Sequence, residues 1–251
     1  MRHTIVLGLI LAAAGSAQAG YANNLDIQID FNGQTWVMSQ YPQDWTTWQD
    51  DGGTVFIRGE STCFQDGQGG QIRAQYELQI NTDSVDGARG FPVASVTSNF
   101  TLTNSFPVTN NFSVVAVLPI SIPFGSTGMR GSFSGSVIDN SGSQNGATVA
   151  ALNGGSMYEA LIDASIVRTL RNDPFGVTAP GGGTASLGTV NFGVPAFEAG
   201  PAATTSIAIR NAFSLTADDS VTNSSTFIIT PAPGAVALAG MAGLVGIRRR
   251  R

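Results

Sequence analysis

Apolar and polar residues alternate along this chain with a period of two. Over residues 71–80 every second side chain is apolar, and the same alternation recurs around Ile27 and Ile207. Successive side chains of a β-strand point to opposite faces, so this period predicts strands with one buried and one solvated face. Asn32-Gly33, which separates two such segments, is a strong short-range signal for a β-hairpin. We therefore expect an all-β protein.

About ten to twelve short strands are expected, separated by turns rich in Gly, Ser, Thr and Asn. Residues 112–122 alternate over a long segment, and Pro119 and Pro123 predict an edge position or a bend there. Residues 157–170 fit both helical and strand spacing, and the strand-like surroundings favour a strand. Because no internal repeat is evident, the pattern indicates an antiparallel β-sandwich of jelly-roll type.

The first 19 residues have the pattern of a secretory signal peptide. A short cationic start precedes an apolar run at residues 5–14, and Ala17 and Ala19 place small residues at the two positions that a signal peptidase reads. Cleavage is expected to leave Gly20 as the mature N-terminus. The alternative is an uncleaved anchor helix.

Residues 231–251 form a second sorting pattern. Pro231-Ala232-Pro233 precedes an uncharged run at residues 234–247. At about 1.5 Å per residue, this run spans roughly 21 Å of a hydrocarbon core that is about 30 Å thick, which suits a transient or weak membrane segment. A cationic end is held on the cytoplasmic side of a membrane. Here that end consists of Arg248, Arg249, Arg250 and Arg251.

This tail resembles the PEP-CTERM sorting signal of bacteria that make exopolysaccharide. In that family a Pro-Glu-Pro motif precedes a short membrane segment and an Arg-rich end, and here Ala232 stands where the family usually has glutamate. The resemblance covers residues 231–251 alone. It implies processing by an exosortase and delivery to the cell surface or the exopolysaccharide matrix. Signal peptidase, an exosortase and exopolysaccharide are then the expected partners of a sandwich at residues 20–230.

The composition of residues 20–230 excludes several functions. This region contains seven arginines and 17 acidic residues, and the chain contains no lysine. So acidic a domain repels phosphate backbones, which argues against binding of nucleic acid. The single histidine, His3, falls in the predicted signal peptide, so Ser-His-Asp and Cys-His catalysis are excluded. One cysteine, Cys63, supplies neither a disulfide nor a zinc site and is expected to be a buried filler.

A glycosidase is the remaining enzymatic alternative, because its chemistry needs only two carboxyl groups held across a sugar ring. Nothing in the sequence places two acidic residues at a catalytic separation, so no catalytic residue is assigned and a non-enzymatic protein is expected. The candidates considered are Asp44, Asp50, Asp51, Glu60 and Glu77.

Four aromatic residues form a candidate carbohydrate site: Trp36, Tyr41, Trp45 and Trp48. They lie among amides and carboxylates, and aromatic faces beside such groups suit the stacking of sugar rings. The alternative is that Trp36 fills the core while Trp45 and Trp48 plug one end of the sandwich. A carbohydrate-binding module is therefore the alternative function.

Acidic turns offer candidate ligands for calcium, which binds carboxylates and turn carbonyls. None of these turns matches an EF-hand loop, and Asp-Gly is ordinary turn chemistry. No metal ligand is therefore assigned and no cofactor is expected. The turns are Asp50-Asp51, Asp66-Gly67, residues 83–87 and Asp218-Asp219.

Overall fold

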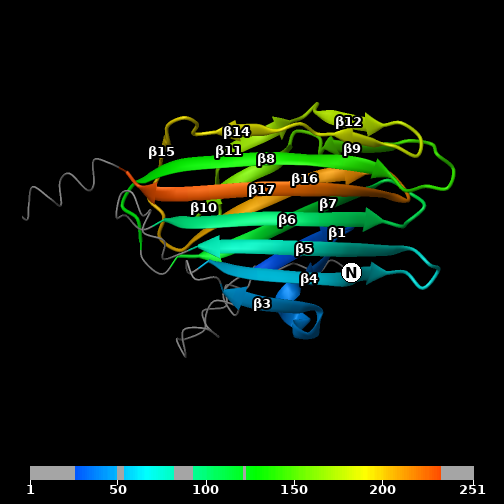
Figure 1. Cartoon of the computed structure of the whole chain (residues 1–251), viewed down its shortest axis with the longest axis horizontal. Helices are drawn as coiled ribbons and strands as arrows, with labels where there is room; N and C mark the ends of the chain where they lie inside the picture. Colours follow the sequence, from blue (N-terminus) through cyan, green and yellow to red (C-terminus); the bar gives the residue numbers. More distant parts are fainter. Residues whose placement is uncertain (1–25, 50–53, 82–92, 121–122, 233–251) are drawn as a thin grey trace, which may run out of the picture.

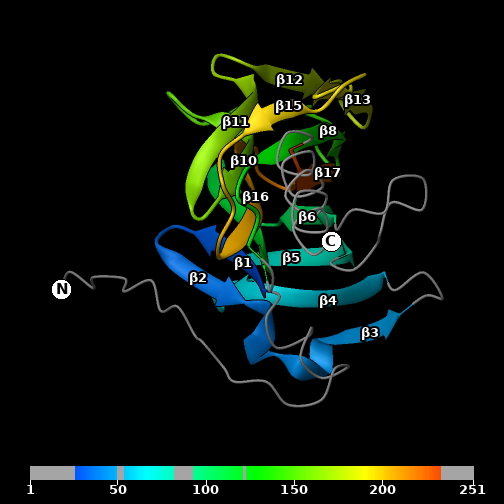
Figure 2. The ribbon, with the colours of Figure 1, turned by 90° about the vertical axis from the view of Figure 1, so that its left-hand side faces the viewer.

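The computed structural model describes residues 26–49, 54–81, 93–120 and 123–232. These residues form an all-β structure of two antiparallel sheets packed face to face (Figure 1), which confirms the predicted all-β class and the antiparallel β-sandwich. Figure 2 shows the two sheets as separate layers, seen from the side. The predicted signal peptide, apolar segment and arginine cluster lie outside the described residues.

The described residues hold seventeen strands, more than the ten to twelve that the sequence predicted, because the short strands β12 to β15 carry no extended alternation and residues 157–170 contain two strands rather than one. The eight-stranded sheet contains, in spatial order, β11 (Ser165–Asn172), β10 (Ser156–Ile162), β16 (Ser206–Leu215), β7 (Asn110–Pro119), β1 (Asp26–Phe31) and β2 (Gln34–Val37), with β9 (Ala147–Ala151) on β16 and β12 (Gly176–Ala179) on β9. The nine-stranded sheet contains β13 (Thr184–Ser186), β8 (Thr127–Asp139), β17 (Asp219–Pro231), β6 (Ala94–Asn104), β5 (Gln71–Asn81), β4 (Val55–Gln65) and β3 (Trp45–Gln49), with β14 (Val190–Phe192) and β15 (Glu198–Gly200) on β8. Two short 3-10 helices, η1 (Met38–Gln40) and η2 (Pro42–Asp44), connect β2 to β3.

Of the edge position or bend predicted for residues 112–122, the edge position is wrong for the part that lies in β7, because β7 pairs with β1 on one side and β16 on the other. Pro119 is the last residue of β7, where it removes a single ladder hydrogen bond. Pairing resumes at the next residue, whose backbone N–H donates to the carbonyl oxygen of Thr205 at 2.9 Å. The proline therefore ends an interior strand.

Aromatic side chains from both sheets fill the space between the layers. Phe213 of β16 lies 5.8 Å from Phe112 of β7 and 6.1 Å from Phe100 of β6, measured between ring centroids. Tyr158 of β10 reaches across the core, and its hydroxyl donates to the carbonyl oxygen of Thr226 on β17 at 2.9 Å. Buried aromatic rings each remove roughly 150–250 Å² from water, so these side chains hold the layers together.

Residues 157–170 form two strands rather than one. The turn Asp163-Ala164 joins β10 to β11, and its φ angles of 49° and 63° are both positive, as a two-residue type I′ hairpin turn requires. All seven residues of β10 are buried, so neither face of this strand is solvated. This is why helical and strand spacing both fitted, and the strand interpretation is confirmed.

The carboxylate of Asp163 fixes this turn to the loop before β16. It accepts hydrogen bonds from the backbone N–H groups of Thr204, Thr205 and Ser206 at 2.7–3.1 Å, and from both threonine hydroxyls at 2.8 Å. Burial opposes ionisation, but these donors outweigh it and hold the pKa of Asp163 well below its usual range. The turn geometry is therefore enforced from outside the hairpin.

Replacing Ala164 with glycine is expected to stabilise the protein by about 1 kcal/mol, because a side chain on left-handed backbone costs roughly 1–2 kcal/mol that glycine avoids. Urea denaturation of the two proteins measures the difference. The control is Ala199→Gly at an exposed position of β15, which should destabilise by roughly 0.5–1 kcal/mol. A loss of stability in Ala164→Gly would contradict the assigned turn.

Candidate functional site

The structure does not gather the four aromatic residues of the predicted carbohydrate site on one surface. Trp36 is buried in the core, and Tyr41 stacks on it with ring centroids 5.5 Å apart. Trp45 packs against the core, whereas Trp48 is 42% exposed. Trp36 is therefore a core residue, as the alternative interpretation expected. Trp48 is the tryptophan that remains exposed to solvent.

Trp48 belongs to an aromatic platform that we define as Trp48 and Phe56. The two residues are register partners on β3 and β4, and their rings stack at 5.2 Å with only 3° between their planes. The guanidinium of Arg58 lies 5.5 Å from the centroid of the Trp48 ring, within the range of a cation–π contact. These contacts fix the orientation of an exposed aromatic surface.

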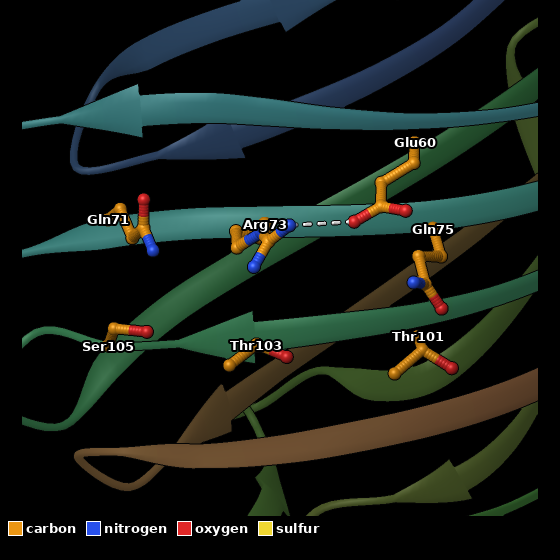
Figure 3. Close-up of a pocket in the computed structure, with 7 residues that line it drawn as sticks. All are labelled: Glu60, Gln71, Arg73, Gln75, Thr101, Thr103 and Ser105. Atoms are coloured by element: carbon orange, nitrogen blue, oxygen red, sulfur yellow. Dashed lines mark hydrogen bonds and ion pairs between the residues drawn. The ribbon is translucent and has the colours of Figure 1, made fainter.

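A polar depression lies beside the platform, on the face of the nine-stranded sheet that points away from the core. It consists of two adjoining hollows, of about 210 and 710 Å³, that share Glu60, Gln75 and Thr101. We call the two together the outer trough. It extends over β3, β4, β5, β6 and β17, and Figure 3 shows the polar side chains that line its smaller part.

The charged side chains of the outer trough are paired. Arg58 donates to Glu77 through Nε at 3.0 Å, and Arg73 lies 2.9 Å from Glu60. The hydrogen bond from Arg58 holds the pKa of Glu77 below its usual range, so this carboxylate stays ionised. Two arginines and two glutamates leave the lining without net charge.

Hydroxyl groups continue the trough over β6 and β17. Thr101 lies 3.1 Å from Thr222 between hydroxyl oxygens, and Thr103 lies 2.7 Å from Ser220. A hydroxyl carries one donor and two acceptor positions, so each of these groups keeps capacity for a further hydrogen bond. The lining therefore both donates and accepts.

Two of the acidic turns, Asp66-Gly67 and Asp218-Asp219, lie among the described residues. Asp66 accepts from the backbone N–H groups of Gln68 and Gly70 at 2.8 and 3.0 Å. Asp219 is buried opposite Asp139, and burial together with that neighbouring charge raises the pKa of Asp219. Within the described ranges, no group of three or more His, Cys, Asp or Glu side chains is placed to hold a metal ion.

The remaining predicted residues have varied surroundings. Asp44 accepts a hydrogen bond from the Ser61 hydroxyl at 2.5 Å. Burial, with the nearby Asp44 carboxylate, raises the pKa of the Cys63 thiol to about 12, which favours an unreactive thiol. Asp50, Asp51 and residues 83–87 lie outside the described residues, as do Ala17, Ala19 and Gly20.

The first residues of the predicted tail belong to the sandwich. Pro231 is the last residue of β17 and lies opposite Thr127 of β8, and the backbone N–H of Ala232 donates to the carbonyl oxygen of Ser126 at 3.1 Å. Pro233 and Arg248 to Arg251 lie beyond the described residues. In the part of the chain that the structure describes, no helix has the length and apolar character needed to cross a membrane.

No protein-family model matches this chain, and no curated protein sequence matches it either. The class that the fold defines is a two-sheet antiparallel β-sandwich. A β-sandwich is compatible with many functions, so the surfaces of the domain and the sequence on either side of it indicate the function.

Proposed function

We propose that this chain is a non-enzymatic exported protein of the cell surface or the exopolysaccharide matrix. A signal peptide at residues 1–19 starts export, and the PEP-CTERM-like tail at residues 231–251 is handled by an exosortase. The observation that carries this proposal is the position of the tail motif, because β17 ends at its first residue, Pro231. Cleavage after Pro233 would leave every strand of both sheets intact.

The finer features of the fold belong to the same proposal. We assign the sandwich to the jelly-roll type, because the chain crosses repeatedly between the two sheets, as it does from β6 to β7, from β7 to β8 and from β16 to β17. Residues 234–247 would form the short apolar helix that pauses in the membrane, with the arginines on the cytoplasmic side.

The chemistry of the domain supports a role without catalysis. Residues 20–230 contain neither histidine nor lysine. Glu60 and Glu77, two candidates for a carboxylate-dependent glycosidase, are engaged with arginines. The glycosidase is thus the weaker alternative, and release of reducing sugars from polysaccharides by the purified protein would establish it.

Carbohydrate binding is the second candidate function, and one observation favours it. The aromatic platform presents the Trp48 ring to solvent beside a trough of hydroxyl and amide groups. Apolar faces of sugar rings stack on such rings while their hydroxyls need polar partners, so the combination suits a sugar polymer.

Export is tested by the position of the mature N-terminus in a bacterial host that encodes an exosortase. The wild-type envelope form should begin at Gly20. Replacing both Ala17 and Ala19 with aspartate should block cleavage, because the peptidase requires small residues at these positions. The control is Gln18→Asn, which leaves both positions unchanged. A wild-type protein that keeps Met1 would contradict the export proposal.

A further inference from the structure

We propose that the outer trough binds an uncharged polysaccharide chain laid across the strands, with one sugar ring stacked on the aromatic platform. This inference rests on the carbohydrate-binding candidate and deepens it by naming the surface and the class of ligand. It places the contact on the outer face of the nine-stranded sheet, away from Trp36 and Trp45.

The charges of the trough and of the whole domain favour a neutral ligand. The arginines of the trough are already paired with glutamates, so an anionic polymer would have to break an ion pair to gain a contact. The domain as a whole adds to this discrimination, because seven arginines against 17 acidic residues give residues 20–230 a formal charge of −10. An acidic polysaccharide would therefore be repelled over a long range.

The hydrogen-bonding groups match a ligand rich in hydroxyls. Gln75 and Asn99 carry amides that donate and accept, and Thr101 and Ser224 carry hydroxyls that do the same. A sugar hydroxyl is likewise both donor and acceptor, so it finds a partner in either orientation. A lipid or an apolar peptide would leave these groups unpaired, at a cost for each buried group.

The platform supplies the apolar contact that such a surface otherwise lacks. Trp48 is held parallel to Phe56 and faces the Arg58 guanidinium, so its ring is oriented before any ligand arrives. Little side-chain entropy is then lost on binding. The C–H face of a pyranose ring can stack there while the rest of the chain continues into the trough.

The dimensions suit an oligosaccharide segment rather than one sugar. The trough crosses five adjacent strands, from β17 to β3. Neighbouring strands lie about 4.8 Å apart, so the outermost two are separated by roughly 19 Å. The larger hollow, at about 710 Å³, falls within the range of established ligand sites.

Affinity electrophoresis of the purified protein tests the inference. The gels contain hydroxyethyl cellulose, galactomannan or dextran as neutral probes, and polygalacturonate as the anionic probe. At least one neutral polysaccharide should retard the wild-type protein, and raising the salt concentration should change this little. Polygalacturonate should not retard it.

Two variants locate the site. Trp48→Ala should weaken retardation at least tenfold by removing the stacking ring, and Gln75→Ala should weaken it several-fold from the centre of the trough. The matched control is Ile166→Ala, which removes an exposed apolar side chain from β11 of the other sheet and should bind like the wild type. Thermal unfolding of each variant verifies that the sandwich is intact.

The outcomes separate this inference from the export proposal. Retardation by no neutral polysaccharide, preferential retardation by polygalacturonate, or an unaffected Trp48→Ala variant would each overturn the inference. None of these results bears on export, which is measured by the N-terminus and location of the same protein in cells. A protein that binds a neutral polysaccharide but never leaves the cytoplasm would instead overturn the export proposal.

Discussion

Replacing Arg248, Arg249, Arg250 and Arg251 together with serine is expected to remove most of the protein from the cell-surface fraction. Placing an arginine at the centre of a membrane costs roughly 2.5–3.5 kcal/mol, so four of them oppose passage by on the order of 10 kcal/mol. Without them, the 14-residue apolar run has no stop signal. The protein should then be released or left unprocessed, as the ratio of cell-bound to released protein measures.

Two variants control for charge and for position. Replacing the same four residues with lysine keeps the positive charge and should leave sorting close to wild type. Arg130→Ser removes a charge from β8, where the side chain stacks on Phe197, and should also leave sorting unchanged. Normal surface delivery of the tetra-serine variant would show that the tail is no more than a weak membrane anchor.

The variant Gly131→Ala is expected to lower the free energy of unfolding by about 3 kcal/mol. Gly131 of β8 faces the core, and a Cβ atom there would lie 2.5 Å from the Tyr158 hydroxyl and 2.5 Å from a ring carbon of Phe192. Overpacking of this kind costs about 1–3 kcal/mol. Displacing Tyr158 from the carbonyl oxygen of Thr226 would add roughly 1–3 kcal/mol, because buried polar groups lose their partner.

A second glycine-to-alanine variant distinguishes overpacking from the general effect of replacing glycine with alanine. At Gly142 a Cβ atom would meet nothing within 4 Å. Gly142→Ala should therefore change the free energy of unfolding by less than about 0.5 kcal/mol. Denaturation midpoints and slopes of both variants provide the comparison. Equal stability of Gly131→Ala and wild type would mean that the two sheets are not joined through Tyr158 as described.

The strands were predictable wherever one face is buried and the other solvated. Residues 71–80 correspond to β5, in which Ile72, Leu78 and Ile80 are buried and the intervening side chains are more exposed. The hairpin at Asn32-Gly33 was likewise evident, and its φ angles of 48° and 78° are both positive. Both features depend on local chemistry that a few adjacent residues determine.

Features that depend on distant parts of the chain were not predictable. The sequence Asp163-Ala164 is not typical of a hairpin turn. Its conformation is imposed by hydrogen-bond donors from residues 204–206. Pro119 and Pro123 indicated an edge position or a bend, but pairing partners on both sides place β7 in the interior. In both cases the deciding contact comes from another segment, which composition and periodicity do not encode.

The candidate site shows the same limit. Trp36 and Trp48 each follow a threonine in a short strand, yet one is 3% and the other 42% exposed. The outer trough combines residues from strands far apart in the chain, such as Asn99 and Ser224, whose side chains are hydrogen-bonded at 2.7 Å. In the sequence, the trough is represented only by the polar residues that alternate with apolar ones along each strand. The order of the strands in the sheet is needed to show that these polar residues lie side by side.

The intact mass of the protein recovered from the cell surface tests both export of the sandwich and its sorting by the tail. We expect a single species that begins at Gly20 and lacks Arg248 to Arg251. A surface species that retains Arg251, or one that begins at Met1, would contradict it.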